Sequence, residues 1–249
     1  MKTINTLVIA VGGKCERIAA DLKKKGINTS KVFLNVSGKP IVSHLIDMAL
    51  RENFQRIYLL ISHYDQEFRT YLNQVYPKNK KIIPIYGGLL GKRWGVPWFL
   101  EQIKNDLNRP FIYSDGNILY KQSILKVIKK YCFNHSLVNL VLSESDYATT
   151  HSSVISSRGR IYCINTRLRP YSKSHVKCML GKCYCSMGLM VINPMIFRTM
   201  RNFSSRKDLD NVVNDIFTTN KGLIKPVIYK GKWLSIHTIK DIDKLKNKW

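Results

Sequence analysis

The chain has 249 residues, of which 45% are hydrophobic, and a formal net charge of +25 at pH 7. This composition excludes a disordered chain, and the length suits one large α/β domain. No stretch approaches the roughly 18 apolar residues of a membrane span, so we expect a soluble, cytoplasmic protein. The excess of Lys and Arg indicates an acidic partner: a nucleic acid, an anionic membrane surface or a strongly anionic small substrate.

The positive charge is spread along the sequence. Short basic clusters such as 23–25, 129–130 and 244–248 lie far apart, whereas a dedicated binding arm usually forms one block. Charge alone therefore leaves open whether the basic side chains form a functional patch or a solvated surface.

The N-terminal apolar run is too short for the core of a secretory signal, so we expect the six cysteines to be reduced thiols. Cys178, Cys183 and Cys185, with His175 nearby, raise the question of zinc. Their spacing matches no common zinc finger or ribbon, and no second cysteine pair completes it. The sequence therefore favours structural thiols over a zinc site.

Strand-like and helix-like segments alternate through the first half. The predicted strands are 6–11, 56–62, 81–86 and 110–114, and the predicted helices are 40–53, 65–76 and 96–107. Repeated β-α-β units with short connections predict a mostly parallel, doubly wound sheet.

The pattern changes after Asp115. A helix is predicted near 120–132 and a strand at 137–143, followed by a Ser/Thr/Arg-rich stretch with short strands such as 160–164. Further predictions are a strand at 188–192, helices near 194–202 and 208–219, a strand at 225–229 and a helix starting near Thr238. We interpret 1–115 as a nucleotide-binding half and 116–249 as an acceptor-binding half of a single domain.

The most informative stretch lies near the N-terminus. The apolar run before Val11 ends in Gly12 and Gly13, and two residues without Cβ atoms let backbone N–H groups approach a polyphosphate. Arg17 and Lys31 are the candidate countercharges. Neither a GxGxxG pattern nor a Walker A loop is present, which excludes a typical dinucleotide-binding or P-loop site.

The stretches VGGKCERI at 11–18 and SKVFLNVSGKPI at 30–41 resemble the opening signature of the sugar-1-phosphate nucleotidyltransferase family. The resemblance continues in order at Leu90-Gly91, Ser114-Asp115, Ser186-Met187-Gly188 and the segment 233–242. It implies a Rossmann-like, GT-A-type fold with a mixed sheet. It also implies transfer of a nucleotide monophosphate to a phosphorylated sugar or related metabolite, for nucleotide-sugar or cell-surface polysaccharide synthesis.

The same resemblance assigns roles to individual residues. Arg17, Lys31 and Asp115 are the expected catalytic residues, and Val11, Gly12, Gly13, Lys14, Gly91 and Ser114 are expected to bind the nucleotide. Arg167, Ser186 and Gly188 are expected to bind the acceptor, and Asp115 is expected to hold Mg²⁺, with His237 as an additional candidate ligand. The expected partners are a nucleoside triphosphate and an anionic phosphorylated acceptor, while the oligomeric state, including a homo-oligomer, stays open.

Several reactive positions depart from the family pattern. Cys15 and Glu16 replace a Gly and a Thr of the phosphate loop, Lys92 replaces a Thr, and Ser235 occupies the slot of a second metal-binding Asp. These departures motivate an alternative, a catalytically weakened nucleotide-binding or partner subunit of the same fold. A nucleic-acid-binding protein is the third hypothesis, which only the net charge supports.

Overall fold

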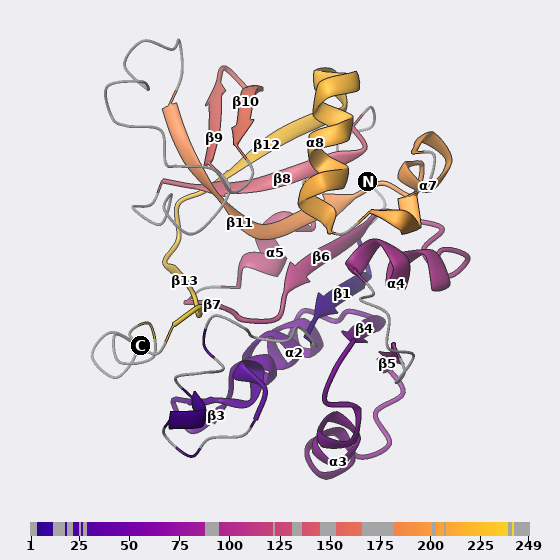
Figure 1. Ribbon diagram of the computed structural model, residues 1–249, viewed down its shortest axis with the longest axis vertical. Coiled ribbons are helices and arrows are strands. Elements are labelled where there is room, and N and C mark those ends of the chain that lie inside the picture. The colour runs from indigo at the N-terminus through magenta and orange to yellow at the C-terminus, as the bar shows by residue number, and fades with distance from the viewer. Residues whose placement is uncertain are drawn as a thin grey trace. The chain divides into compact units, whose positions relative to one another are not determined.

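The computed structural model describes residues 4–11, 18, 22–24, 26, 29–87, 95–121, 123–130, 136–144, 153–165, 182–200, 203–206, 208–238 and 241. The chain divides into two compact units (Figure 1). The first contains Met1–Trp94, Ser114–Val127 and Gly231–Trp249, and the second contains Gly95–Tyr113 and Ile128–Lys230. The single domain with two sequential halves stays a prediction.

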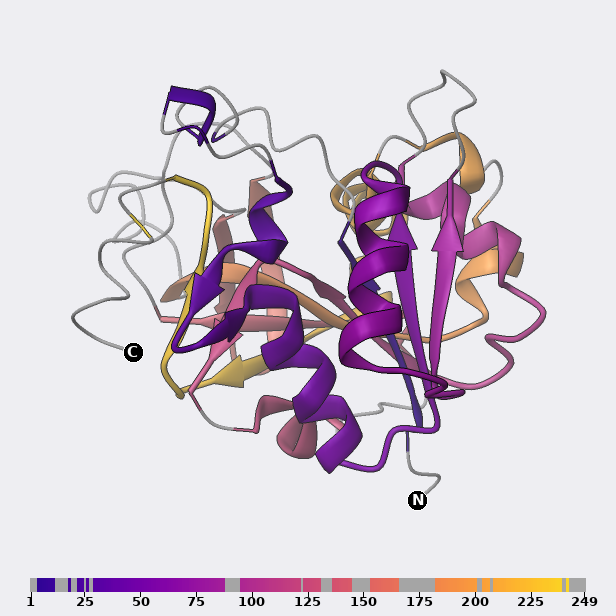
Figure 2. The ribbon, with the colours of Figure 1, turned by 90° about the horizontal axis from the view of Figure 1, so that it is seen from below.

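A parallel sheet forms the centre of the first unit. Its strands are β1 (Thr6–Ala10), β4 (Arg56–Ile61) and β5 (Ile82–Tyr86), and β4 pairs in parallel with both neighbours. Figure 2 shows β4 and β5 running in the same direction beside α3 (Asp65–Val75). The apolar runs of β1 and β4 are buried on both faces, as parallel strands covered by helices require, whereas in β5 only Ile82 is buried.

Helix α2 (Ile41–Arg51) follows a small hairpin of β2 (Asn35–Val36) and β3 (Lys39–Pro40). The hairpin turn has positive φ at both central residues, 49° at Ser37 and 86° at Gly38, as a type I′ turn requires. The 3₁₀ turn η1 (Lys31–Phe33) precedes the hairpin. The apolar face of α2, which includes Ile41, Leu45 and Ala49, is fully buried, so the predicted helix is confirmed.

A second antiparallel pair of strands joins distant parts of the first unit. Strand β7 (Ile118–Tyr120) pairs antiparallel with β13 (Trp233–Ser235). The helix predicted over 120–132 is therefore wrong at its start, because Tyr120 pairs with Trp233. Helix α5 covers only Ile124–Ile128.

The second unit contains a mixed sheet around a long strand, β11 (Lys182–Ile192). This strand pairs antiparallel with β8 (Val138–Ser143) and β9 (Ser153–Ser157), and it neighbours β6 (Phe111–Asp115). Strand β10 (Arg160–Asn165) pairs antiparallel with β9, and β12 (Ile224–Tyr229) pairs in parallel with β8. The two units together confirm the α/β class with a mixed sheet.

Helices and 3₁₀ turns complete the second unit. They are α4 (Val96–Gln102), α7 (Ile196–Thr199), η3 (Phe203–Ser205), α8 (Leu209–Thr219) and η4 (Lys221–Leu223). Helix α8 packs on β12 and begins at Asp208, whose side chain accepts a hydrogen bond from the Asn211 N–H. Helix α4 is shorter than the predicted 96–107, and the chain after Gln102 continues as turns.

Strand β11 is longer than predicted. The sequence pattern suggested a start at Gly188, whereas the strand already begins at Lys182. Gly188 has a φ of 62°, and the pairing with β8 changes register between Ser186 and Met190. The strand therefore passes through a bulge, which breaks the two-residue periodicity on which the prediction rested.

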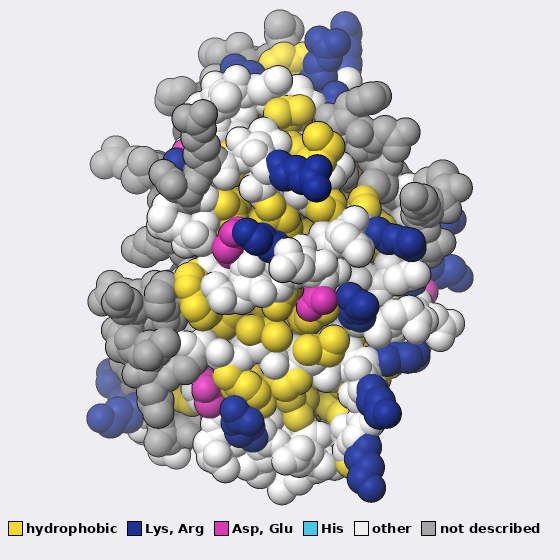
Figure 3. All heavy atoms as spheres, turned by 90° about the vertical axis from the view of Figure 1, so that its right-hand side faces the viewer, with side chains coloured by type: hydrophobic (Ala, Val, Ile, Leu, Met, Phe, Trp, Pro, Cys, Tyr) yellow, Lys and Arg dark blue, Asp and Glu magenta, His cyan; other side chains and the backbone are white. Residues whose placement is uncertain are grey.

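Among the described residues, no helix combines the length and the apolar character that a membrane crossing demands. On the face drawn in Figure 3, Lys and Arg side chains are dispersed, and several stand beside Asp or Glu side chains. The scattered charge of the sequence thus remains scattered on this face.

Candidate active site

The carboxyl ends of the strands in the first unit meet at one edge of the sheet. Beyond β1, the Val11 N–H donates to the Leu60 carbonyl (3.1 Å). Beyond β5, the Gly87 N–H donates to the Ile61 carbonyl (2.7 Å). Val11 itself is 2% exposed. In open α/β sheets this edge is where ligands bind.

Gly116 brings the candidate metal ligand to this edge. Its N–H donates to the Ala10 carbonyl over 2.9 Å, so the chain directly after Asp115 lies against the end of β1. A Cβ at position 116 would lie 2.7 Å from Val11 Cγ1 and 2.8 Å from the Ala10 oxygen. Only glycine permits this approach. The sequence alone indicates no role for this glycine beyond that of a turn residue, because its partners lie at the end of a distant strand.

Ser114 and Asp115 end β6 with different surroundings. Ser114 is fully buried, and its Oγ donates to the Asp115 carbonyl (3.0 Å) and lies 3.5 Å from the Tyr120 hydroxyl. Its hydroxyl thus fixes the end of the strand, and nucleotide binding by Ser114 stays a prediction. The Asp115 side chain is only partly buried, which suits a carboxylate that acts on a ligand.

Asn117 ties this strand end to the segment after β13. Its side-chain Nδ2 donates to the Ser235 Oγ (3.2 Å) and to the Ile236 carbonyl (2.9 Å). In return, the Ile236 N–H donates to the Asn117 carbonyl (3.0 Å). Asn117 is 6% exposed, and nothing in the sequence alone connects it with position 235.

The Ser235 hydroxyl in turn holds His237. Ser235 is 2% exposed, and its Oγ lies 2.8 Å from His237 Nε2. Because the hydroxyl oxygen already accepts a hydrogen bond from Asn117, its proton is available to His237 Nε2. In this arrangement the Ser235 hydroxyl orients the imidazole two residues further on.

Asp241 fixes the backbone on the other side of His237. Its Oδ2 accepts hydrogen bonds from the His237 N–H (3.0 Å), the Thr238 N–H (2.8 Å) and the Thr238 hydroxyl (2.9 Å). One oxygen of the Asp241 carboxylate is thus occupied by three hydrogen bonds within the protein. In the part of the chain that the structure describes, no three His, Cys, Asp or Glu side chains form a metal-binding group.

Lys31 is the catalytic candidate cation that the structure describes. It starts η1 next to the fully buried Ser30, and its carbonyl accepts the Leu34 N–H (3.3 Å). Its side chain is partly buried. The other predicted residues of the phosphate and base loops, Gly12, Gly13, Lys14, Arg17 and Gly91, lie outside the described residues.

The predicted acceptor residues belong to the second unit. Ser186 and Gly188 lie on either side of Met187 in the bulge of β11, and Ser186 is 6% exposed. Bulges often redirect side chains beside active sites, so an acceptor role for both residues stays a prediction. Arg167 lies outside the described residues.

Of the described cysteines, Cys185 is buried, and Cys163 and Cys183 are partly buried. Burial raises the pKa of the Cys185 thiol to about 12, and burial together with Cys163 raises the pKa of Cys183. Cys178 and His175, the other two residues behind the question of zinc, lie outside the described residues, so the interpretation as structural thiols stays a prediction.

Two solved structures share this fold over almost the whole chain. The inositol-1-phosphate CTP transferase from T. maritima has a TM-score of 0.74 at 17% identity, with 99% of this chain and 98% of that chain covered. HddC from Yersinia pseudotuberculosis has a TM-score of 0.74 at 18% identity, with 98% and 99% covered. At these identities, the likeness establishes the fold.

The sequence comparisons give a shorter match. No protein-family model matches the chain. The 2-C-methyl-D-erythritol 4-phosphate cytidylyltransferase of Chlamydia abortus is 31% identical over 113 residues, which are 44% of this chain. The match spans 46%, about half, of the length of that relative.

Proposed function

We propose that the protein joins the nucleotide monophosphate unit of a nucleoside triphosphate to a sugar-1-phosphate or related phosphorylated metabolite and releases pyrophosphate. The observation that carries the proposal is the position of Asp115, which Gly116 holds against the end of β1 at the ligand-binding edge of a nucleotidyltransferase fold. The similar proteins named above transfer cytidylyl groups or bind nucleotides: HddC has also been solved with GMP-PN.

In this reaction a phosphate oxygen of the acceptor attacks the α-phosphorus of the triphosphate, and the bond to the pyrophosphate oxygen breaks. The protein has to align the two anions and stabilise the charge on the phosphoryl oxygens. We assign this stabilisation to Arg17 and Lys31, and the cradle for the triphosphate to the backbone of 11–14. Arg167, Ser186 and Gly188 are the proposed contacts to the acceptor.

The residues at the end of β6 fit a magnesium ion. Mg²⁺ prefers oxygen ligands and keeps several waters, so one carboxylate, that of Asp115, is a sufficient protein ligand when substrate phosphates supply the rest. His237, whose Nε2 lies 2.8 Å from the Ser235 hydroxyl, is the additional candidate that the resemblance implies. When bound, the ion would neutralise charge on the reacting phosphate.

The most direct test is a pyrophosphate-release screen of the four triphosphates with Mg²⁺ against phosphorylated sugars and polyols. Lys31→Ala should abolish turnover, whereas Lys104→Ala, which removes a lysine from an exposed ion pair with Glu101, should not change it. Undiminished turnover of Lys31→Ala would remove the proposed active site.

A second measurement addresses the metal. Asp115→Ala should lose the dependence of activity on Mg²⁺ concentration and, independently of activity, the stabilisation that Mg²⁺ gives to the nucleotide-bound protein. An unchanged Mg²⁺ response in both measurements would exclude Asp115 as a ligand.

The transferases among the similar proteins do not favour the alternative of a catalytically weakened subunit. That alternative requires nucleotide binding without transfer to any acceptor, so one productive pair of triphosphate and acceptor would exclude it. Nucleic-acid binding would show as an oligonucleotide affinity that falls steeply with salt. Because triphosphates and reduced thiols belong to the cytoplasm, we propose that compartment.

A further inference from the structure

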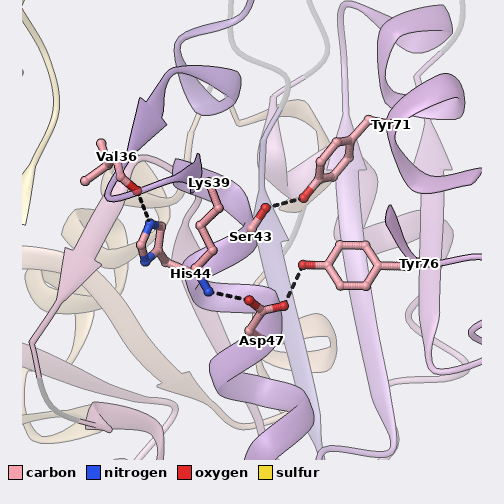
Figure 4. Close-up of polar contacts among 7 residues, drawn as sticks. All are labelled: Val36, Lys39, Ser43, His44, Asp47, Tyr71 and Tyr76. Carbon is pink, nitrogen blue, oxygen red and sulfur yellow. Dashed lines mark hydrogen bonds and ion pairs between the residues drawn. The ribbon is translucent and has the colours of Figure 1, made fainter. Parts of the chain in front are cut away.

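A polar face of α2 connects the hairpin before it with the helix after it (Figure 4). Asp47 is the centre of this face. Its Oδ2 receives the ammonium of Lys39 from β3, and its Oδ1 accepts a hydrogen bond from the Tyr76 hydroxyl at the end of α3 (2.7 Å). The two oxygens of one carboxylate thus hold two different elements.

Two further contacts run parallel to these. His44 Nε2 donates to the Val36 carbonyl of β2 (2.9 Å), and Ser43 Oγ lies 2.5 Å from the Tyr71 hydroxyl of α3. Burial, followed by the hydrogen bond with Asp47, raises the pKa of Tyr76, so its hydroxyl stays protonated and keeps donating. All of these side chains belong to the first unit.

The segment that these contacts hold begins with Lys31. The ring of Phe33, in the same 3₁₀ turn, packs against Phe68 (4.5 Å between ring centroids) and Tyr71 (5.0 Å) of α3. The Ile41 N–H at the start of α2 donates to the Leu34 carbonyl (3.1 Å). The chain from Lys31 to α2 is therefore anchored at both ends.

From this arrangement we propose that Asp47 is a positioning residue for Lys31, acting through Lys39 and Tyr76. The inference rests on the proposed function, in which Lys31 stabilises the triphosphate. The Lys39–Asp47 pair is partly exposed, with 37% and 33% of the side chains accessible, and such pairs contribute little to overall stability. Its effect is on the geometry of the 31–40 segment and thus on the placement of the Lys31 ammonium.

The sign of the effect separates positioning from simple electrostatics. Asp47→Asn removes a negative charge from the unit that binds an anion, and by charge alone this would strengthen triphosphate binding. Loss of positioning would weaken it. Weaker binding by the more positive variant therefore requires a geometric cause.

The experiment is a double-mutant cycle on the dissociation constant of the productive triphosphate, measured by calorimetry. Asp47→Asn should weaken binding about fivefold in the wild-type background and by less than about twofold in the Lys31→Ala background. Tyr76→Phe and Lys39→Gln each remove one of the two contacts of Asp47. Each should cause a smaller loss of affinity, with the same dependence on Lys31. Asp47→Glu, which keeps a carboxylate, should recover part of the affinity.

Glu101→Gln is the matched control, because it neutralises a carboxylate in another lysine ion pair, in the second unit. It should leave the affinity unchanged. Equal losses in both Lys31 backgrounds, or no loss on Asp47→Asn, would overturn the positioning role while the proposed function stands. If Lys31→Ala itself leaves the affinity unchanged, both the proposed role of Lys31 and the inference fail.

Discussion

At the scale of single residues, the site depends on positions whose importance lies in contacts across the fold. Gly116 matters because Val11 and the Ala10 carbonyl lie within 3 Å of where its Cβ would be. Asn117 matters because its amide reaches Ser235 and Ile236. The sequence alone gives no reason to regard Gly116 or Asn117 as more than a turn residue.

Gly116→Ala should therefore destabilise the protein. The new methyl group would overlap the Ala10 carbonyl and Val11, and forced overpacking costs about 1–3 kcal/mol. Urea unfolding of the variant and the wild type would measure this loss of unfolding free energy. A variant as stable as the wild type would show that the end of β6 can move away from β1 without cost.

His44 should make the stability pH-dependent. Burial, with a smaller contribution from Lys39, lowers its pKa below the ordinary value of 6.5. Below that value the unfolded chain takes up a proton that the folded chain refuses, so stability falls as the pH decreases from 6.5 toward the lowered pKa. Above pH 6.5 this loss is absent.

The comparison of wild type with His44→Gln at about pH 7.5 and 5 isolates this effect, since glutamine can still donate to the Val36 carbonyl. The wild type should lose more unfolding free energy on acidification than the variant. Equal losses would show that His44 titrates alike in both states.

At the scale of elements, some structures follow from the local sequence, and others form only by pairing between distant segments. The hairpin before α2 follows from its turn, since Gly38 tolerates a φ of 86° and the residue before it must also adopt positive φ. In contrast, β7 and β13 form by pairing with each other, although more than a hundred residues separate them in the sequence. The bulge at Gly188 likewise depends on the neighbouring strand β8.

Ser37→Asn should stabilise the hairpin. Asn tolerates positive φ better than Ser, and Asn-Gly is the preferred type I′ pair, so we expect a gain of about 0.5 kcal/mol. Thermal unfolding would detect it as a higher midpoint. Gly38→Ala provides the opposite control and should lower the midpoint, because alanine is strained at this φ.

At the scale of the whole molecule, the net charge of +25 is the dominant property. Many like charges repel one another in the compact state, and salt screens this repulsion. The dispersed Lys and Arg side chains of Figure 3 agree with a general surface charge on that face.

Raising sodium chloride from about 0.02 to 0.3 M should therefore increase the thermal midpoint, since the Debye length falls well below typical distances between surface charges. Potassium chloride should act equally, because screening depends on ionic strength. A midpoint that falls with salt would indicate that specific ion pairs outweigh the repulsion.

Much of the fold was predictable because it rests on local patterns. The apolar runs of β1, β4 and β6 and the helical periodicity of α2, α3 and α8 place these elements within a residue or two of their observed bounds. Lys31 was a candidate countercharge from the N-terminal pattern, and the resemblance supported Lys31 and Asp115 as catalytic residues. Asp47, Gly116 and Asn117 were not, because their partners are brought near only by the folded chain.

The sequence by itself determined the α/β class through its short-range periodicity, and its short motifs predicted a nucleotidyltransferase with candidate residues at Lys31 and Asp115. Only the tertiary structure decided that Ser235 orients His237, that Gly116 holds the end of β6 against β1, and that Asp47 links the Lys31 segment to α3. These features depend on contacts between residues distant in sequence, and their geometry exists only once the sheet and helices have packed.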